Sequence, residues 1–118
     1  MSSLSASVAL HESANVVLNG SGAGIAKVGP TSGREAWSPA KVHVSAATNV
    51  NEAECSVFVG VDTGPNGFRD ITFSGSSGDT TDAVENDTVK CGTYILASWT
   101  GGDAGSVATM VVTGSKTI

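Results

Sequence analysis

The amino-acid sequence predicts an all-β protein, an antiparallel two-sheet β-sandwich or jelly roll of about eight short strands. Three observations favour this fold class. Apolar residues alternate with polar ones in short runs, Gly, Pro, Asn, Asp and Ser separate the runs, and no segment has the 3.6-residue period of a helix. The 118 residues suffice for one hydrophobic core and are too few for two, so we expect one domain.

The strands are expected in short, evenly spaced segments. The first runs over 15–19, and a shorter candidate at 7–10 precedes it; the others are 24–29, 40–47, 54–60, 69–75, 87–91, 93–99 and 106–114. Alternation leaves His43 and Ser45 outside and directs one set of side chains to the core. That set is Val42, Val44, Ala46, Cys55, Val57, Val59, Ile71, Phe73, Val89, Cys91, Ile95, Ala97, Trp99, Ala108, Met110 and Val112.

Turn residues fill the connections at 62–68, 74–82 and 100–106. In the last of these we expect a hairpin turn, with Gly101, Gly102 and Gly105 at positive φ and Asp103 bonding its own backbone two residues on. Residues 1–12 are small and polar, so they are expected to form a free tail or an arm that pairs with a neighbouring subunit. Residues 13–118 then form the sandwich domain.

The net charge argues against several classes of partner. Eleven acidic and six basic residues give a charge of −5, and residues 51–103 carry nine of the acidic side chains. Such a chain repels phosphate, so we expect no nucleic-acid partner. The N-terminus has neither the basic region nor the apolar run of a signal peptide, and no later segment is apolar enough to span a membrane. We therefore expect a soluble protein without a membrane partner.

A glycine-rich segment, "VVLNGSGAGIAKVG" at 16–29, resembles the start of a dinucleotide-binding fold. That chemistry requires a helix directly after the glycines, so that the helix N-terminus can hold the pyrophosphate. Here Gly29-Pro30 follows after four residues, and Gly20, Gly22 and Gly24 have the wrong spacing. A glycine-rich hairpin turn is the preferred interpretation.

Residues for metal binding and catalysis are present without a recognisable arrangement. The loop 74–88 gathers Asp79, Asp82, Glu85 and Asp87, whose oxygens suit calcium, but the spacing does not match a calcium loop. A solvated acidic loop that protects a sheet edge is the alternative. Neither His11 nor His43 accompanies a nucleophile motif, and the carboxylates Glu52 and Glu54 also fit ordinary edge charges. We therefore expect no catalytic, cofactor-binding or metal-binding residues and no enzymatic activity.

The two cysteines and two tryptophans are expected to be structural. Cys55 and Cys91 lack a C-x-x-C spacing and are expected as buried thiols, with a disulfide between them as the alternative. Trp99 is expected in the core, whereas Trp37, just before Pro39, is expected either to anchor the entry of a strand or to lie in an interface.

Several strings occur in an order that resembles a known family. They are "AKVGPTSGREAW", "VHVSAATN", "ECSVFVG", "SGSSGDTTD" and "YILASWTGGDAGSVATMVVTG", within residues 24–114. Together they are similar to the small all-β virion proteins of tailed bacteriophages of actinobacteria, which serve as capsid decoration, minor capsid or minor tail proteins. The resemblance implies a non-enzymatic structural role in the virion, with the major capsid protein or other virion proteins as partners. It brings no catalytic residues.

Two functions from different classes therefore remain. A virion subunit would bind its lattice through a sandwich edge or the N-terminal arm, as a homo-oligomer. A carbohydrate- or receptor-binding domain would instead use loops at one end of the sandwich, around Asp62, Asp79 and Asp103.

Overall fold

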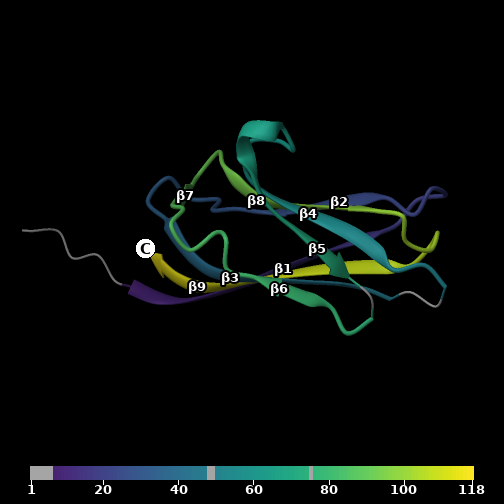
Figure 1. Cartoon of the computed structure of the whole chain (residues 1–118). Helices are drawn as coiled ribbons and strands as arrows, with labels where there is room; N and C mark the ends of the chain where they lie inside the picture. The colour runs from purple at the N-terminus through teal and green to yellow at the C-terminus, as the bar shows by residue number, and fades with distance from the viewer. Residues whose placement is uncertain (1–6, 48–49, 75) are drawn as a thin grey trace, which may run out of the picture.

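The computed structural model describes residues 7–47, 50–74 and 76–118 and contains two antiparallel sheets (Figure 1). The larger sheet has the order β1-β9-β3-β6, and β7 also pairs with β3. Its strands are β1 (Ser7–Val17), β9 (Val107–Thr117), β3 (Ala36–Ala46), β6 (Asp79–Thr81) and β7 (Val89–Lys90). The smaller sheet has the order β2-β8-β4-β5, with β2 (Gly24–Val28), β8 (Tyr94–Thr100), β4 (Ala53–Gly60) and β5 (Phe68–Ser74). A 3-10 turn, η1 (Pro65–Gly67), precedes β5. The predicted all-β sandwich is confirmed.

The chain repeatedly crosses from one sheet to the other. Strands β1, β3 and β9 belong to the five-stranded sheet, and β2, β4 and β8 belong to the four-stranded sheet. The glycine-rich segments 18–23 and 101–106 therefore join strands of different sheets, and the prediction of hairpins at both places is wrong. The first long strand, β1, pairs with the last strand, β9, along its whole length from Ser7↔Thr117 to Val17↔Val107.

The core lies between the sheets and is built by the alternation that the sequence predicts. Side chains of β3, β4, β8 and β9 interdigitate, and each has at most 1% of its surface exposed. These are Val42, Val44, Ala46, Cys55, Val57, Ile95, Ala97, Trp99, Ala108, Met110 and Val112. Burying one large aliphatic or aromatic side chain contributes about 1.5–3 kcal/mol, so this layer is the main source of stability.

Three strand assignments need correction. Of the predicted strand 69–75, residues 69–74 belong to β5, but with the opposite faces, because Thr72 is buried while Ile71 and Phe73 are exposed. Segment 87–91 shrinks to the two residues of β7, so Cys91 lies in an exposed turn rather than in the core. Strand β6 lies inside a segment predicted as a loop.

The predicted boundary at residue 12 is absent from the structure. Residues 7–12 are the first half of β1 and pair with β9 of the same chain. Residues 1–6, the remainder of the predicted arm, lie outside the described residues. The β1 strand therefore forms part of the sandwich from Ser7 onward.

Trp37 anchors the entry of a strand, which was one of its two predicted roles. It is the second residue of β3, is 2% exposed, and belongs to the core cluster. Its indole N–H donates a hydrogen bond to Glu35, and Glu35 also lies 3.6 Å from the ammonium of Lys116 on β9. This contact holds the start of β3 against the end of the last strand.

Candidate functional site

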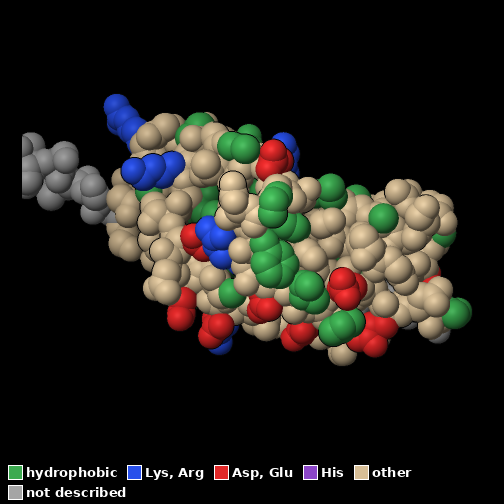
Figure 2. All heavy atoms as spheres, turned by 45° about the horizontal axis from the view of Figure 1, so that its top comes forward, with side chains coloured by type: hydrophobic (Ala, Val, Ile, Leu, Met, Phe, Trp, Pro, Cys, Tyr) green, Lys and Arg blue, Asp and Glu red, His purple; other side chains and the backbone are tan. Residues whose placement is uncertain are grey.

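The outer face of the four-stranded sheet carries a set of large apolar side chains, four of which are exposed. We call this set the apolar face; it consists of Ile25, Phe58, Phe68, Ile71, Phe73 and Leu96. Phe58 and Leu96 lie at its centre, 9% and 4% exposed, whereas the other four are 42–61% exposed. Figure 2 shows hydrophobic side chains gathered in a band on this side of the molecule. Exposed apolar groups that are contiguous mark a binding surface more often than scattered ones do.

Strand pairing brings these side chains together. Phe58 of β4 lies opposite Leu96 of β8 on one side and Phe68 of β5 on the other. The rings of Phe58 and Phe68 meet edge to face, with centroids 5.8 Å apart and an interplanar angle of 74°. Edge-to-face packing of this kind is a favoured aromatic geometry. Phe58, Phe68 and Leu96 are therefore direct neighbours, whereas Ser98 and Ser56 lie between Ile25 and Ile71 in the next row of the sheet.

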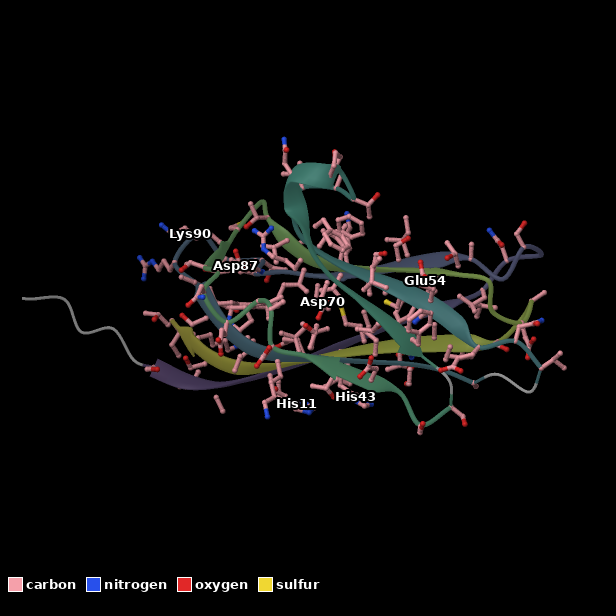
Figure 3. All side chains as sticks on the ribbon, viewed as in Figure 1. His11, His43, Glu54, Asp70, Asp87 and Lys90 are labelled. Carbon is pink, nitrogen blue, oxygen red and sulfur yellow. The ribbon has the colours of Figure 1, made fainter. Side chains whose placement is uncertain are left out.

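The inverted orientation of β5 creates most of this surface. Its polar side chains face the five-stranded sheet and the loop before β7, where each has a partner. Arg69 forms two hydrogen bonds to Asp87, at 2.8 and 2.9 Å, and these raise the pKa of the Arg69 guanidinium. Asp70 accepts a hydrogen bond from the hydroxyl of Thr81. Figure 3 shows Asp70 and Asp87 on this inner side.

Thr72 completes the inner side of β5, since its buried hydroxyl donates to the carbonyl of Cys55 at 3.1 Å. A one-residue slip of β5 would turn these polar groups outward and place Ile71 and Phe73 inside. The slip would also leave Asp87 and Thr81 without these partners, and a buried polar group without a hydrogen bond costs about 1–3 kcal/mol. The polar contacts therefore fix the register that exposes Ile71 and Phe73.

The charge around the apolar face is unevenly distributed. Glu54 lies directly opposite Phe73, and the exposed carboxylates Asp79, Asp82 and Glu85 follow from β6 into the next loop, on the β5 side. On the β2 side, Lys27 lies 4.5 Å above the ring of Tyr94. Figure 2 shows acidic side chains along one margin of the view. The surface thus has an apolar centre with an acidic rim along β5 and β6.

The predicted calcium ligands do not converge. Asp87 is committed to Arg69, and the carboxylate of Asp79 accepts a hydrogen bond from the backbone N–H of Thr80 at 2.9 Å. Within the residues that the structure describes, no three His, Cys, Asp or Glu side chains lie close enough to hold a metal ion.

The two histidines project from the outer face of the five-stranded sheet (Figure 3). His43 is exposed, as predicted, and its Nδ1 lies 2.7 Å from the hydroxyl oxygen of Thr80. Glu54 points outward from the other sheet, and Glu52 precedes β4. The structure therefore does not bring the histidines and the predicted carboxylate pair to one site.

The loops proposed for glycan or receptor binding are not together. Asp62 follows β4 and Asp103 follows β8, and these strands are antiparallel neighbours, so their following loops lie at opposite ends of the sandwich. Asp79 lies opposite Val44, toward the Asp103 end. A hollow of about 310 Å³ within the β4–β5 connection is lined by residues 59–62 and 64–67. Asp62 is occupied in that turn, where it accepts a hydrogen bond from the N–H of Gly64.

The side chain of Asp103 links two connections of the chain, and its backbone carbonyl accepts a hydrogen bond from the N–H of Ser106 within its own turn. Its carboxylate accepts hydrogen bonds at 3.0 Å from the backbone N–H groups of Val50 and Asn51 and from the Asn51 side chain. Gly101 and Gly105 have φ values of 75° and 82°, as predicted, whereas the positive φ predicted for Gly102 is wrong. The segment therefore connects the β8–β9 connection to the β3–β4 connection at one end of the sandwich.

The two cysteines are free thiols in different environments. Cys55 is buried, and burial raises the pKa of its thiol to about 12, while Cys91 is exposed. We expect one thiol per chain to react with a disulfide reagent near neutral pH and two to react in denaturant, because thiolates are the reactive species. A Cys91→Ser variant should lose the fast reaction. Fast labelling of Cys55 in the folded protein would contradict the buried assignment.

Fold and surface together define a two-sheet β-sandwich with one exposed apolar face. A scan against protein-family models finds no match, and searches of curated proteins and of solved structures find none either. Among the described residues, no helix has the length and apolar character needed to cross a membrane.

Proposed function

We propose that this protein is a non-enzymatic structural subunit of a bacteriophage virion, an accessory protein that decorates or stabilises the capsid or forms part of the tail. The motifs listed above support this role through their similarity to small all-β virion proteins. The observation that carries the proposal is the apolar face. Its four open side chains lie on a rigid sheet, and a repeating lattice would cover that sheet with many identical contacts.

Charge restricts the partner that this face fits. Two copies of the chain that meet through this face with β5 against β5 would bring their acidic rims near each other, which is unfavourable. A virion protein with an apolar patch bordered by Lys and Arg is complementary to both parts of the surface. We therefore propose the major capsid protein or another lattice protein of that chemistry as the partner. Its binding should weaken as salt screens the rim.

The test is the protein content of purified particles. Virions from the phage whose genome carries the gene are banded by density, and their proteins are quantified by mass spectrometry. We expect this chain in a fixed ratio to the major capsid protein or to a tail protein. Its absence from banded particles, with the protein present in the soluble lysate, would overturn the proposal. The same follows if the neighbouring genes encode no capsid, portal or tail proteins.

A further inference from the structure

The open edges of the two sheets differ in how well they are protected. Three of the four edges described in the structure are short or interrupted. The edge at β6 and β7 has strands of three and two residues, and β2 has five residues including Gly24 and Lys27. Strand β5 has a register irregularity opposite Val57 and Phe58, and the Asp70 side chain accepts the backbone N–H of Ile71. These are devices that discourage edge-to-edge pairing.

Strand β1 lacks such protection. It is an edge strand of 11 residues, "SVALHESANVV", without Pro, Gly, Lys or Arg, and it pairs with β9 without a register shift. Its one charged side chain, Glu12, lies 3.8 Å from Lys116 of its own chain. A long, regular edge of this kind is a template for another strand.

The hydrogen bonds next to β1 show which of its groups face the open edge. One residue beyond the strand, the N–H of Leu18 donates to the carbonyl of Ser106 and the Leu18 carbonyl accepts from Gly105, both at 2.8 Å. The backbone groups of Leu18 therefore point toward the β9 side. Because backbone direction alternates along an antiparallel strand, the odd-numbered residues of β1 direct their N–H and C=O groups away from β9.

We propose that β1 pairs in antiparallel fashion with β1 of a second copy of this chain, about a two-fold axis at Ser13, so that two five-stranded sheets become one continuous sheet. This register places Leu10 opposite Val16 and Ala9 opposite Val17. It therefore covers Val17, which is 63% exposed in the single chain. The odd-numbered groups of both strands then form the new ladder. This proposal does not depend on a role in a virion.

Side-chain pairing favours the axis at Ser13 over its neighbours. An axis at Glu12 would oppose two carboxylates, and like charges directly opposite each other destabilise a strand pair. An axis at His11 would oppose two imidazoles and place Leu10 against Glu12. With the axis at Ser13, Glu12 lies opposite Ala14 and His11 opposite Asn15, so no like charges meet. A two-fold interface needs this kind of self-complementarity.

Sedimentation of the full chain tests the dimer. In a concentration series that ends at about 0.5 mM, we expect the mass to reach twice that of the 11.7 kDa chain. The variant Ser13→Lys, which opposes two ammonium groups at the axis, should sediment as a single chain with an unchanged circular dichroism spectrum. Its matched control is Ser38→Lys, an exposed serine of β3 in the same sheet, which should remain dimeric. A single-chain mass for the unaltered protein, or a dimeric Ser13→Lys, would overturn the proposal.

Amide hydrogen exchange measured by NMR locates the interface independently. In the dimer, the odd-numbered amides of Ala9, His11, Ser13 and Asn15 should exchange at least about ten-fold more slowly than in Ser13→Lys. The even-numbered amides, which bond β9, serve as an internal control and should be protected in both proteins. A dimer whose odd-numbered amides exchange rapidly would use another surface. A single chain that dimerises only after deletion of residues 1–6 would show that this segment occupies the edge, which also overturns the proposal.

Discussion

A Gly22→Ala variant should lose about 2–5 kcal/mol of unfolding free energy, a large part of the stability of a domain of this size. A β-carbon at Gly22 would lie 1.9 Å from the carbonyl oxygen of Gly102 and 2.6 Å from its carbonyl carbon, so backbone must move. The φ of Gly22 is also +72°, which costs any L-residue energy. The movement would disturb the hydrogen bond from the N–H of Gly102 to the carbonyl of Gly22. Urea denaturation at constant temperature measures the loss.

Two further glycines separate these causes. Gly101 has a φ of +75° with open space around its β-carbon, so Gly101→Ala should cost only the backbone term of about 1–2 kcal/mol. Gly20 has neither a positive φ nor a neighbour within 4 Å, so Gly20→Ala should stay within about 0.5 kcal/mol of the unaltered protein. If Gly22→Ala is no worse than Gly101→Ala, the close approach of the two loops is not important for stability.

The same contact explains two glycine-rich motifs that the sequence leaves without a chemical role. The segment 18–23 and the segment 101–106 pack backbone against backbone where the chain crosses between the sheets. Their glycines permit this approach. Each motif examined alone looks like a turn or a ligand loop, whereas the mutual contact depends on residues about eighty positions apart. Sequence pattern alone does not reveal it.

Alternation predicts the central strands well because each has one buried face. In β3, β4, β8 and β9 the predicted inward residues are buried, except that Val59 is only partly buried, since a one-residue shift would expose the whole set. The prediction fails in a strand whose inner side carries polar residues and whose outer side carries apolar ones. In β5, Ile71 and Phe73 were the natural core candidates, yet the inner side is polar because Arg69 and Asp70 find partners at Asp87 and Thr81.

The candidate binding surface was hidden from the sequence for the same reason. Rules that place apolar residues inside assign Ile71 and Phe73 to the core and leave no exposed patch to detect. The sequence feature that could have indicated this orientation is the pair Arg69-Asp70 next to Phe68. Charged side chains that point inward from a strand require partners, so such a pair indicates that the inner side of the strand is polar. Those partners are Thr81, the last residue of β6, and Asp87 in the loop after it, and their positions depend on strand pairing. Connectivity between sheets was missed likewise, because β1 pairs with β9 at the other end of the chain.

The proposed docking through the apolar face predicts that the double variant Ile71→Ser, Phe73→Ser loses binding to the particle while keeping its fold. Both side chains are exposed in the single chain, at 47% and 61%, so the unfolding free energy should change by no more than about 1 kcal/mol. Covering the remaining exposed surface of the two half-buried side chains contributes about half of the 1.5–3 kcal/mol that full burial of each would give, so affinity for particles assembled without this protein should fall at least about 10-fold. Co-sedimentation with those particles measures the change.

The control and the salt dependence decide whether the apolar face itself is the contact. Val50 is 85% exposed in the β3–β4 connection and lies outside the strands that carry the apolar face, so Val50→Ser removes an exposed apolar side chain and should bind normally. Raising the salt concentration should weaken binding of the unaltered protein, because the acidic rim contributes through screened interactions. A double variant that binds as tightly as Val50→Ser would assign the docking to another surface. An exposed apolar face lowers the solubility of a protein. If the face does not bind a partner, the exposure of Ile71 and Phe73 on β5 has a cost in solubility and no function that explains it.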